Sequence, residues 1–428
     1  MRFLLLLTTL LLAACGSHGL KLKKDPTVDP LSQIKADLAF TCQHERIPEP
    51  SADSDLLFQY ARWLQKNNQL KEDPAVDAEV ERLYRIAAAH QHYKANINLQ
   101  NGSMRGHFKL RGDEHLRLSQ ELIEAGVATG YYFVGIFLQQ GAAGLREDPA
   151  MALRYYRKAA DEGSALGQAR VAKKLAPIRI APDIARQMRR CAAEQGHGDA
   201  ATDLGVDLAG DGLYEEALEA YQLGTAAGYS TSASFLMKGF RGPKPEDRLY
   251  YLAQEKDPER AARYERIWSI LADYSYAQPS VPEINDIVPL PPAKLPPWDG
   301  TLKWLEAREA NIPPPKPSEA LTQQLAKARQ LDPATGRPLP GSPHFITVDA
   351  PAPVCDSGQP CPHAGYWQAV ALTQNRLAHL HDGAIRRFEQ GEILPTLLVR
   401  QNQPRLWPLP DRITVGEELI EWRMLGEA

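Results

Sequence analysis

A short pattern of small residues recurs along the middle of this chain at a spacing in the thirties. In four copies a glycine closes an alanine-rich run and a second small-residue stretch follows. In the first copy we expect histidine in the place of that glycine. The five anchor positions are 34, 37, 33 and 32 residues apart, at His92, Gly126, Gly163, Gly196 and Gly228. Such a period predicts a helical solenoid, in which each helix pair covers the apolar stripe of its neighbour.

Local residue chemistry agrees with this interpretation. Alanines allow helices to approach closely, and a glycine permits the left-handed conformation with which many helices end. Asp148 followed by Pro149 predicts a helix start, because an aspartate side chain caps free amides and proline suits the first helical position. We therefore expect helices from about residue 55 to 275, and a non-repetitive helical bundle is the alternative.

The stretch from Asp148 to Ala169 resembles a Sel1-like repeat, a relative of the tetratricopeptide class. It has an alanine- and tyrosine-containing helix, then Ala-Ala-x-x-Gly, then a helix of small residues. The resemblance covers roughly half the chain and is weaker before residue 120. It implies a mainly α fold, an α-α solenoid, in a protein that acts as an interaction scaffold and is not an enzyme.

The first fifteen residues have the layout of an export signal. A positive start is followed by an apolar run from Phe3 to Leu12 and then by Leu12-Ala13-Ala14-Cys15. This is typical of a secretory signal peptide, and its end resembles the lipobox of bacterial lipoproteins. The resemblance implies that residues 1–14 are removed, that Cys15 is lipidated, and that the body lies in the periplasm at the outer membrane. The alternatives are an ordinary signal peptide and a transmembrane anchor, for which the run is short.

Four further cysteines remain, namely Cys42, Cys191, Cys355 and Cys361. In an exported chain an even number favours disulfides. Turn-forming residues separate Cys355 from Cys361, so we favour that pair, which leaves Cys42 to pair with Cys191. The alternative is a zinc site of Cys355, Cys361 and His363, but structural zinc requires four ligands and the fourth is not evident.

Composition sets the domain organisation. The mature chain is too long for one hydrophobic core, and a formal net charge of −4 offers no basic excess for nucleic acid. Eleven prolines between residues 278 and 317 favour extended geometry, and we expect this segment to lie against the solenoid through Trp298 and Trp304. The expected units are a signal peptide, a tether, the solenoid, a proline-rich strap and a small α+β domain: 1–14, 15–35, 36–277, 278–317 and 318–428.

Within the last unit we expect a helix over 318–330 and a turn at 332–336. Short strands are expected at 344–348, 397–400 and 412–415, because these segments are rich in β-branched and apolar residues. Between the first two strands we expect a helix over roughly 367–380.

Three segments of the tail and one at the start add a sharper resemblance. They are 289–300, 361–367, 387–395 and 38–48. All resemble bacterial lipoproteins that combine Sel1-like repeats with a domain of unknown function. Members of that group are read as immunity proteins of type VI secretion, encoded beside lipase effectors that include phospholipase D-like ones. The resemblance implies a protein partner, a secreted lipase, that is neutralised by steric occlusion.

The sequence offers no recognisable catalytic motif. There is no Gly-x-Ser-x-Gly elbow, no His-Glu-x-x-His and no phosphate loop, so we expect no enzyme activity, no metal and no cofactor. An aromatic stretch is the candidate partner surface, with Tyr131, Tyr132, Tyr155 and Tyr156 as anchors or, alternatively, as filling between helices. Acidic residues between Asp203 and Glu216 are expected to form a solvated face or to contact a basic partner. The alternative function is a periplasmic scaffold or regulator of envelope proteins.

Overall fold

The computed structural model describes residues 38–176, 181–345, 353–371, 378–380, 385–403 and 412–427. The chain divides into two compact units, Met1–Ala39 and Phe40–Ala428, and all elements below belong to the second. Cys15, the signal peptide and the tether over 15–35 lie outside the described residues. Within those residues, no helix is both long and apolar enough to cross a membrane.

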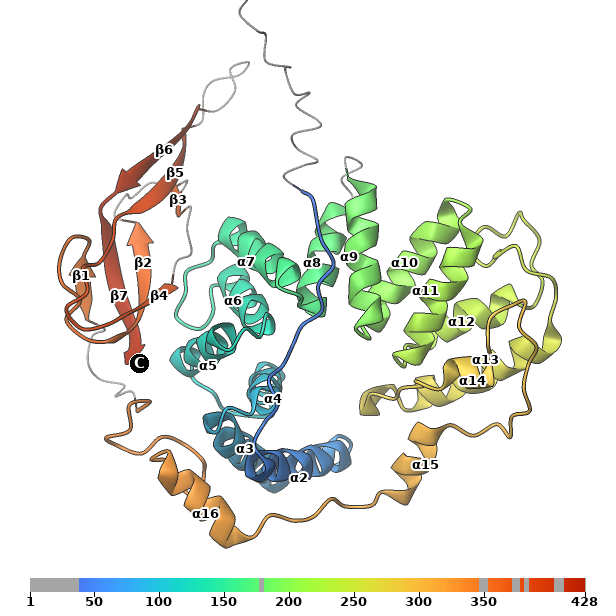
Figure 1. Cartoon of the computed structure of the whole chain (residues 1–428), viewed down its shortest axis with the longest axis horizontal. Coiled ribbons are helices and arrows are strands. Elements are labelled where there is room, and N and C mark those ends of the chain that lie inside the picture. The colour runs from blue at the N-terminus through green and yellow to red at the C-terminus, as the bar shows by residue number, and fades with distance from the viewer. Residues whose placement is uncertain are drawn as a thin grey trace, which may run out of the picture. The chain divides into compact units, whose positions relative to one another are not determined.

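Twelve successive helices build the body of the described chain (Figure 1). Each packs against the next one along the chain, which is the arrangement of an α-α solenoid. The fold class expected from the sequence, mainly α with a small strand region, is thereby confirmed. The helices are α2 (Ala52–Asn68), α3 (Pro74–Ala89), α4 (Tyr93–Met104), α5 (Gly112–Glu124), α6 (Thr129–Gln140), α7 (Pro149–Asp161), α8 (Ala165–Leu175), α9 (Pro182–Glu194), α10 (Gly198–Gly210), α11 (Tyr214–Ala226), α12 (Ser230–Gly239) and α13 (Pro258–Asp273).

The repeated glycines end the first helix of each pair in the left-handed conformation. Gly126, Gly163, Gly196 and Gly228 all have positive φ. In the first copy the expectation for His92 is wrong, because Gln91 takes the left-handed position with φ 61°. His92 is instead the cap of α4, where its Nδ1 accepts a hydrogen bond from the Ala95 amide at 3.1 Å.

Helix starts follow the capping chemistry expected from the sequence. The Asp148 carboxylate accepts a hydrogen bond from the Met151 amide at 2.9 Å, and Pro149 opens α7. His197 caps α10 as His92 caps α4, accepting from the Ala200 amide at 3.2 Å. Satisfying the free amides of the first turn in this way stabilises each helix by about 1 kcal/mol.

The proline-rich strap packs on the last helices of the solenoid. It follows a 3-10 turn (Ser275–Ala277) and contains α14 (Ile284–Ile287) and α15 (Lys303–Ala310). Its apolar residues Val281, Ile284 and Val288 are buried in the core formed by α10 to α13, and Trp298 packs against that core. Trp304 meets Tyr274 edge-on, with ring centroids 5.5 Å apart.

The same strap also contacts the first helices. The Asn311 side chain accepts hydrogen bonds from Trp63 and Asn67 of α2, each at 3.0 Å. Helix α16 (Glu319–Ala328) then packs on α3, where Ala326 is fully buried in the core formed by α2 to α4. The strap and α16, which are consecutive in the chain, thus contact both ends of the solenoid (Figure 1).

The C-terminal residues form strands in two small sheets: β1 (Val354–Asp356), β2 (Gly365–Ala371), β3 (Ala378–Leu380), β4 (Ile385–Phe388), β5 (Leu397–Gln403), β6 (Arg412–Glu418) and β7 (Ile420–Glu427). The sheet orders are β1-β7-β2-β4 and β3-β5-β6, with antiparallel pairing throughout. The expected strands at 397–400 and 412–415 and the expected helix over 318–330 are present.

One local expectation is wrong. The segment expected as a helix over 367–380 begins as β2, a central strand between β7 and β4. Trp367 is fully buried there, and its indole nitrogen donates to the His363 carbonyl at 3.1 Å. Burial of aromatic side chains on a pleated surface overrides helix propensity at such a site. His344 and Phe345 of the expected strand at 344–348 are not in a strand, and its remainder lies outside the described residues.

Candidate partner-binding surface

The four tyrosines expected as partner anchors pack on one another between α6 and α7. Tyr156 is buried, and its hydroxyl donates to Gln139 at 2.8 Å. Its ring lies 5.5 Å from that of Tyr132, while Tyr131 and Tyr155 are 6.2 Å apart. These contacts fit the alternative in which the rings fill the layer between helices.

The acidic residues of α10 and α11 face arginines of α9. Arg186 pairs with Asp207 at 2.7 Å and also with Asp211. Arg190 pairs with Glu216 at 3.0 Å. The negative charge of this face is therefore largely compensated by arginines within the repeat array. The face attracts a basic partner less strongly than its acidic sequence indicates.

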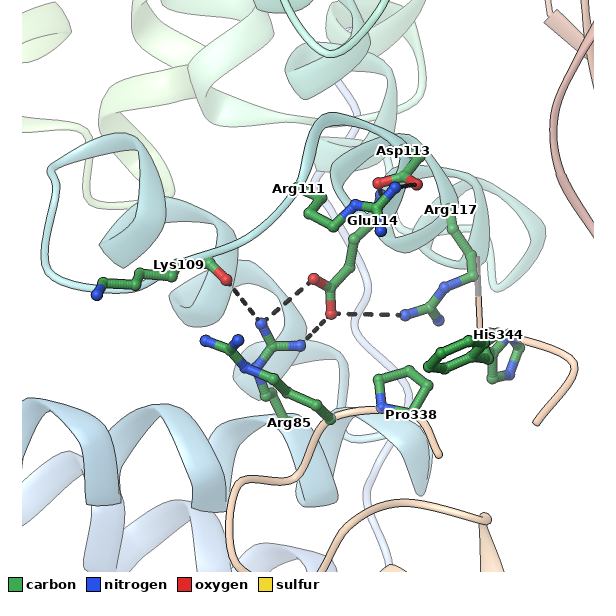
Figure 2. Close-up of a pocket in the computed structure, with 10 residues that line it drawn as sticks. Arg85, Lys109, Arg111, Asp113, Glu114, Arg117, Pro338 and His344 are labelled. Atoms are coloured by element: carbon green, nitrogen blue, oxygen red, sulfur yellow. Dashed lines mark hydrogen bonds and ion pairs between the residues drawn. The ribbon is translucent and has the colours of Figure 1, made fainter. Parts of the chain in front are cut away.

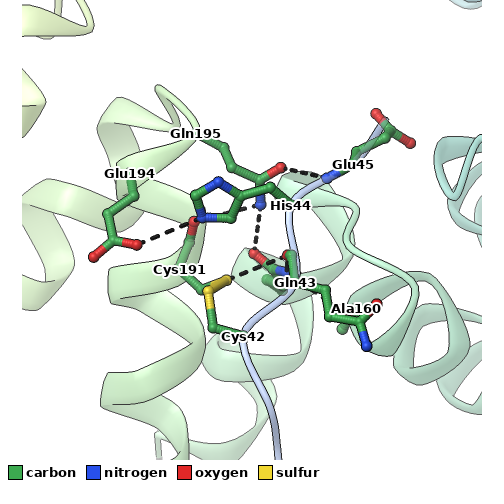
Figure 3. Close-up of a disulfide and its surroundings, with 9 residues drawn as sticks. Cys42, Gln43, His44, Glu45, Ala160, Cys191, Glu194 and Gln195 are labelled. Atoms are coloured by element: carbon green, nitrogen blue, oxygen red, sulfur yellow. Dashed lines mark hydrogen bonds and ion pairs between the residues drawn. A yellow bond between two sulfur atoms is a disulfide. The ribbon is translucent and has the colours of Figure 1, made fainter. Parts of the chain in front are cut away.

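A disulfide joins Cys42 to Cys191, which ties the extended segment 40–50 to α9 (Figure 3). Glu45 of this segment caps α6, its carboxylate accepting from the Thr129 amide at 2.5 Å and hydroxyl at 3.0 Å. Burial raises the pKa of Glu45, and the hydrogen bonds from Thr129 oppose that rise.

The favoured bridge between Cys355 and Cys361 is not formed, and both are free thiols. The Cys361 thiol donates to the His363 carbonyl at 3.0 Å. The Cys355 thiol instead donates to the Pro360 carbonyl at 3.8 Å. Each sulfur is thus directed to a backbone carbonyl, since the edge strand β1 and the turn after it fix the two side chains separately.

A cavity of about 210 Å³ opens between α3, α5 and the residues that follow α16 (Figure 2). Five cationic side chains line it against only two acidic ones. The lining residues are Arg85, Lys109, Arg111, Asp113, Glu114, Arg117, Arg337, Pro338, His344 and Phe345. We call this cavity the arginine pocket.

Ion pairs fix the floor of the arginine pocket. Arg85 is almost fully buried and pairs with Glu81 at 2.9 Å and with both carboxylate oxygens of Glu114. It also donates to the Lys109 carbonyl at 2.9 Å. Arg117 extends the network to Glu121 at 2.5 Å. Burial of such groups is tolerated because each charge has a partner and further hydrogen bonds.

The rim of the pocket carries exposed cations. Lys109, Arg111 and Arg337 are exposed, as is the aromatic ring of Phe345. Arg111 pairs with Asp113 at 3.0 Å, but the Lys109 ammonium forms no ion pair within the described residues, and Figure 2 shows it pointing away from the arginines. Arginines and aromatic rings are the residue types that dominate binding hot spots.

His344 closes one side of the pocket as a neutral side chain. Burial, followed by the charges of Arg117 and Arg329, lowers the pKa of His344 to about 4. Its Nδ1 has no hydrogen-bond partner among the described residues. The arginine pocket therefore combines a rigid, charge-paired floor with a cationic rim that suits an acidic protein surface.

Sequence reasoning did not find the arginine pocket. Its residues come from positions 85, 109–117 and 337–345, which lie far apart in the sequence. No local motif joins them, although Arg111, Asp113, Glu114 and Arg117 form a dense run of charges in one stretch of the sequence.

Comparisons with known proteins match the chain to repeat proteins and to one uncharacterised domain. The family model "Domain of unknown function (DUF6396)" matches residues 232–339, which include most of α12 and all of α13, the strap and α16. No curated protein matches the chain.

Solved structures similar to the chain include immunity proteins and a Sel1 repeat protein. The immunity protein Pa5087 from Pseudomonas aeruginosa is 23% identical, with 59% of this chain and 95% of that one covered and a TM-score of 0.45. For the immunity protein PA5088 from the same organism the values are 21%, 59%, 94% and 0.47. For a Sel1 repeat protein from Oxalobacter formigenes they are 20%, 46%, 86% and 0.34. The chain is thus similar both to immunity proteins and to a Sel1 repeat protein, as its sequence indicated.

Proposed function

We propose that this protein is a lipid-anchored periplasmic immunity protein that binds and neutralises a type VI secretion lipase effector, of phospholipase D-like type, by steric occlusion. The observation that carries the proposal is the resemblance of segments 289–300, 361–367 and 387–395 to lipoproteins read as immunity proteins. Segment 289–300 packs on the last helices of the solenoid, and the arginine pocket near the first helices offers a surface suited to that role.

Occlusion requires a large surface that is already in place before the partner arrives. A stable complex buries about 800 Å² on each partner, and preorganised surfaces lose less entropy on binding. The strap restrains both ends of the solenoid, and segment 40–50 is fixed by a disulfide and by Glu45. The cationic rim of Lys109, Arg111 and Arg337 would attract an acidic region of the effector and accelerate the encounter.

Anchoring would place the protector where the toxin acts. A lipase must reach lipid, and an N-terminal lipid on Cys15 would hold the immunity protein on the same membrane. More than one acyl chain is needed for stable attachment. Metabolic labelling with an alkyne fatty acid tests this part alone: wild-type protein should be labelled and the Cys15→Ser variant should not.

Affinity capture from the producing bacterium tests the proposal as a whole. The protein without residues 1–15 is incubated with periplasmic extract, and retained proteins are identified by mass spectrometry. We expect a secreted lipase at one copy per chain, and we expect its activity to be inhibited by added protein. Capture of resident envelope proteins alone would instead favour a scaffold or regulator.

A further inference from the structure

The disulfide lies within a set of metal-ligand side chains. Among the described residues, Cys42, His44 and Cys191 form a group of three whose ligand atoms all lie within 4.8 Å of one another. A carboxylate is also present, since Glu194 Oε2 lies 3.5 Å from His44 Nε2 (Figure 3). We propose that, when the Cys42–Cys191 bond is reduced, this group binds one Zn²⁺ ion through the two thiolates and the His44 imidazole.

The donor set has the chemistry that zinc prefers. Cysteine sulfur and histidine nitrogen are its usual protein ligands, at about 2.3 Å and 2.0 Å. A ligating histidine commonly directs its second nitrogen to a carboxylate, which fixes the ring and raises its basicity. Glu194 Oε2 lies at His44 Nε2, so it would take that role with Nδ1 binding the ion. Solvent completes the fourth position, which makes this an open three-ligand site and not a closed structural one.

The site is open to an arriving ion. Cys42 and His44 are exposed, only Cys191 is buried, and the His44 and Glu194 side chains are 51% and 43% exposed. A hollow lined by Cys42, His44, Gly126 and Glu162 adjoins the sulfurs, with Arg46 as its one cation. Little rearrangement is needed, because Cys42 belongs to an extended surface segment and its side chain is free to rotate once the sulfur–sulfur bond is broken.

Reduction and oxidation interconvert the two forms of the site. A dithiol or phosphine reductant gives two electrons to the disulfide, two protons are taken up, and two thiols form. Zn²⁺ then displaces both thiol protons. Oxidation of the two thiolates by a disulfide oxidant removes two electrons, re-forms the sulfur–sulfur bond and releases the ion. Metal and disulfide are thus alternative clamps that hold segment 40–50 on α9 before and after the chain is oxidised.

Zinc counting on the purified protein tests this assignment. The protein is reduced anaerobically with a phosphine, desalted, exposed to Zn²⁺, passed through a second column and denatured in the presence of a colour-forming chelator. We expect one zinc per reduced chain and none per oxidised chain. Replacing the half-exposed His44 by alanine should weaken binding at least tenfold, and Glu194→Gln should weaken it about tenfold.

The matched control separates this site from the other two cysteines. A Cys355→Ser/Cys361→Ser variant should keep its zinc, because those thiols do not join a ligand group in the described residues. The proposal is overturned if reduced wild-type protein binds no zinc, or if zinc is lost from the control variant and retained by His44→Ala. Circular dichroism of each variant confirms that folding is unchanged.

Discussion

At the scale of single residues, the closest constraint is the contact between Gly163 and segment 40–50. Gly163 has φ +106°, and a Cβ on it would lie 2.8 Å from the Glu45 nitrogen and from the His44 carbonyl carbon. Gly196 holds the equivalent repeat position with φ +86°, but a Cβ there would meet nothing within 4 Å. The two glycines share a backbone requirement, and only the first also makes room for another segment.

Alanine substitution should separate these two requirements. We expect Gly196→Ala to lower the free energy of unfolding by about 1 kcal/mol, from backbone strain alone. Gly163→Ala should cost about 3 kcal/mol, because the backbone of segment 40–50 must also move. Urea unfolding under oxidising conditions measures both values, and equal losses would show that segment 40–50 does not lie against Gly163.

A buried histidine makes the stability depend on pH. His115 is buried between Gln100 and Phe137, and burial lowers its pKa to about 4. In the unfolded chain the imidazole takes up a proton near pH 6.5, whereas the folded protein stays unprotonated until about pH 4. The contribution of the neutral His115 to stability is therefore fully present above pH 6.5. It is lost as the pH is lowered from 6.5 towards 4.

His115→Gln should remove this contribution while keeping a polar side chain. We expect wild-type protein to lose up to about 3 kcal/mol more than the variant between pH 7 and pH 4. Urea unfolding at several pH values in this range measures the difference. Parallel stability profiles for the two proteins would contradict the burial of the His115 imidazole.

At the scale of elements, the sequence was most informative where one residue type ends or begins a helix. The glycine spacing predicted the helix pairs, and Asp148-Pro149 predicted the start of α7, because both depend on nearby backbone geometry. The first anchor was misplaced by one residue, since Gln91 adopts positive φ without being glycine. The strand β2 was missed because burial of Trp367 in a sheet depends on pairing with a distant strand, where Met424 of β7 is its partner.

The candidate surface was less predictable for the same reason. The tyrosines of α6 and α7 are local in sequence, yet their exposure depends on how neighbouring helices pack. The arginine pocket requires α16 to pack on α3 so that the residues after α16 reach α5, a contact with no signal in the sequence of either partner. The disulfide between Cys42 and Cys191 spans 149 residues, and it was predicted only as the pair left over once Cys355–Cys361 was favoured. That second bridge is not formed.

Docking of α16 on α3 is the element contact that most directly holds the strap. Ala326 is fully buried there, whereas Ala320 on the same helix is exposed. We expect Ala326→Arg to release α16 and to make the segment between α15 and α16 a site of rapid cleavage by proteinase K. Ala320→Arg should be cleaved as slowly as wild type. Equal protection of both variants would contradict the docking.

At the scale of the whole molecule, the strap restrains the two ends of the repeat array, and the disulfide ties the segment before α2 to α9. Closing a loop of 149 residues is expected to stabilise the folded state by about 2–5 kcal/mol through loss of unfolded-chain entropy. The Cys42→Ser/Cys191→Ser variant should lose that amount in unfolding measured with a chelator present. Cys355→Ser should change the unfolding free energy by less than about 0.5 kcal/mol. No loss in the double variant would show that the unfolded chain is not restrained by this bond.

Survival of bacteria that carry the captured lipase in their periplasm tests the central claim most directly. We expect cells to survive when they co-express the wild-type protein or Lys244→Glu, whose exposed lysine lies outside the arginine pocket. Cells co-expressing Lys109→Glu/Arg337→Glu should die, because charge reversal on the rim repels an acidic effector surface. Death of the cells that co-express the wild-type protein would contradict the immunity function itself.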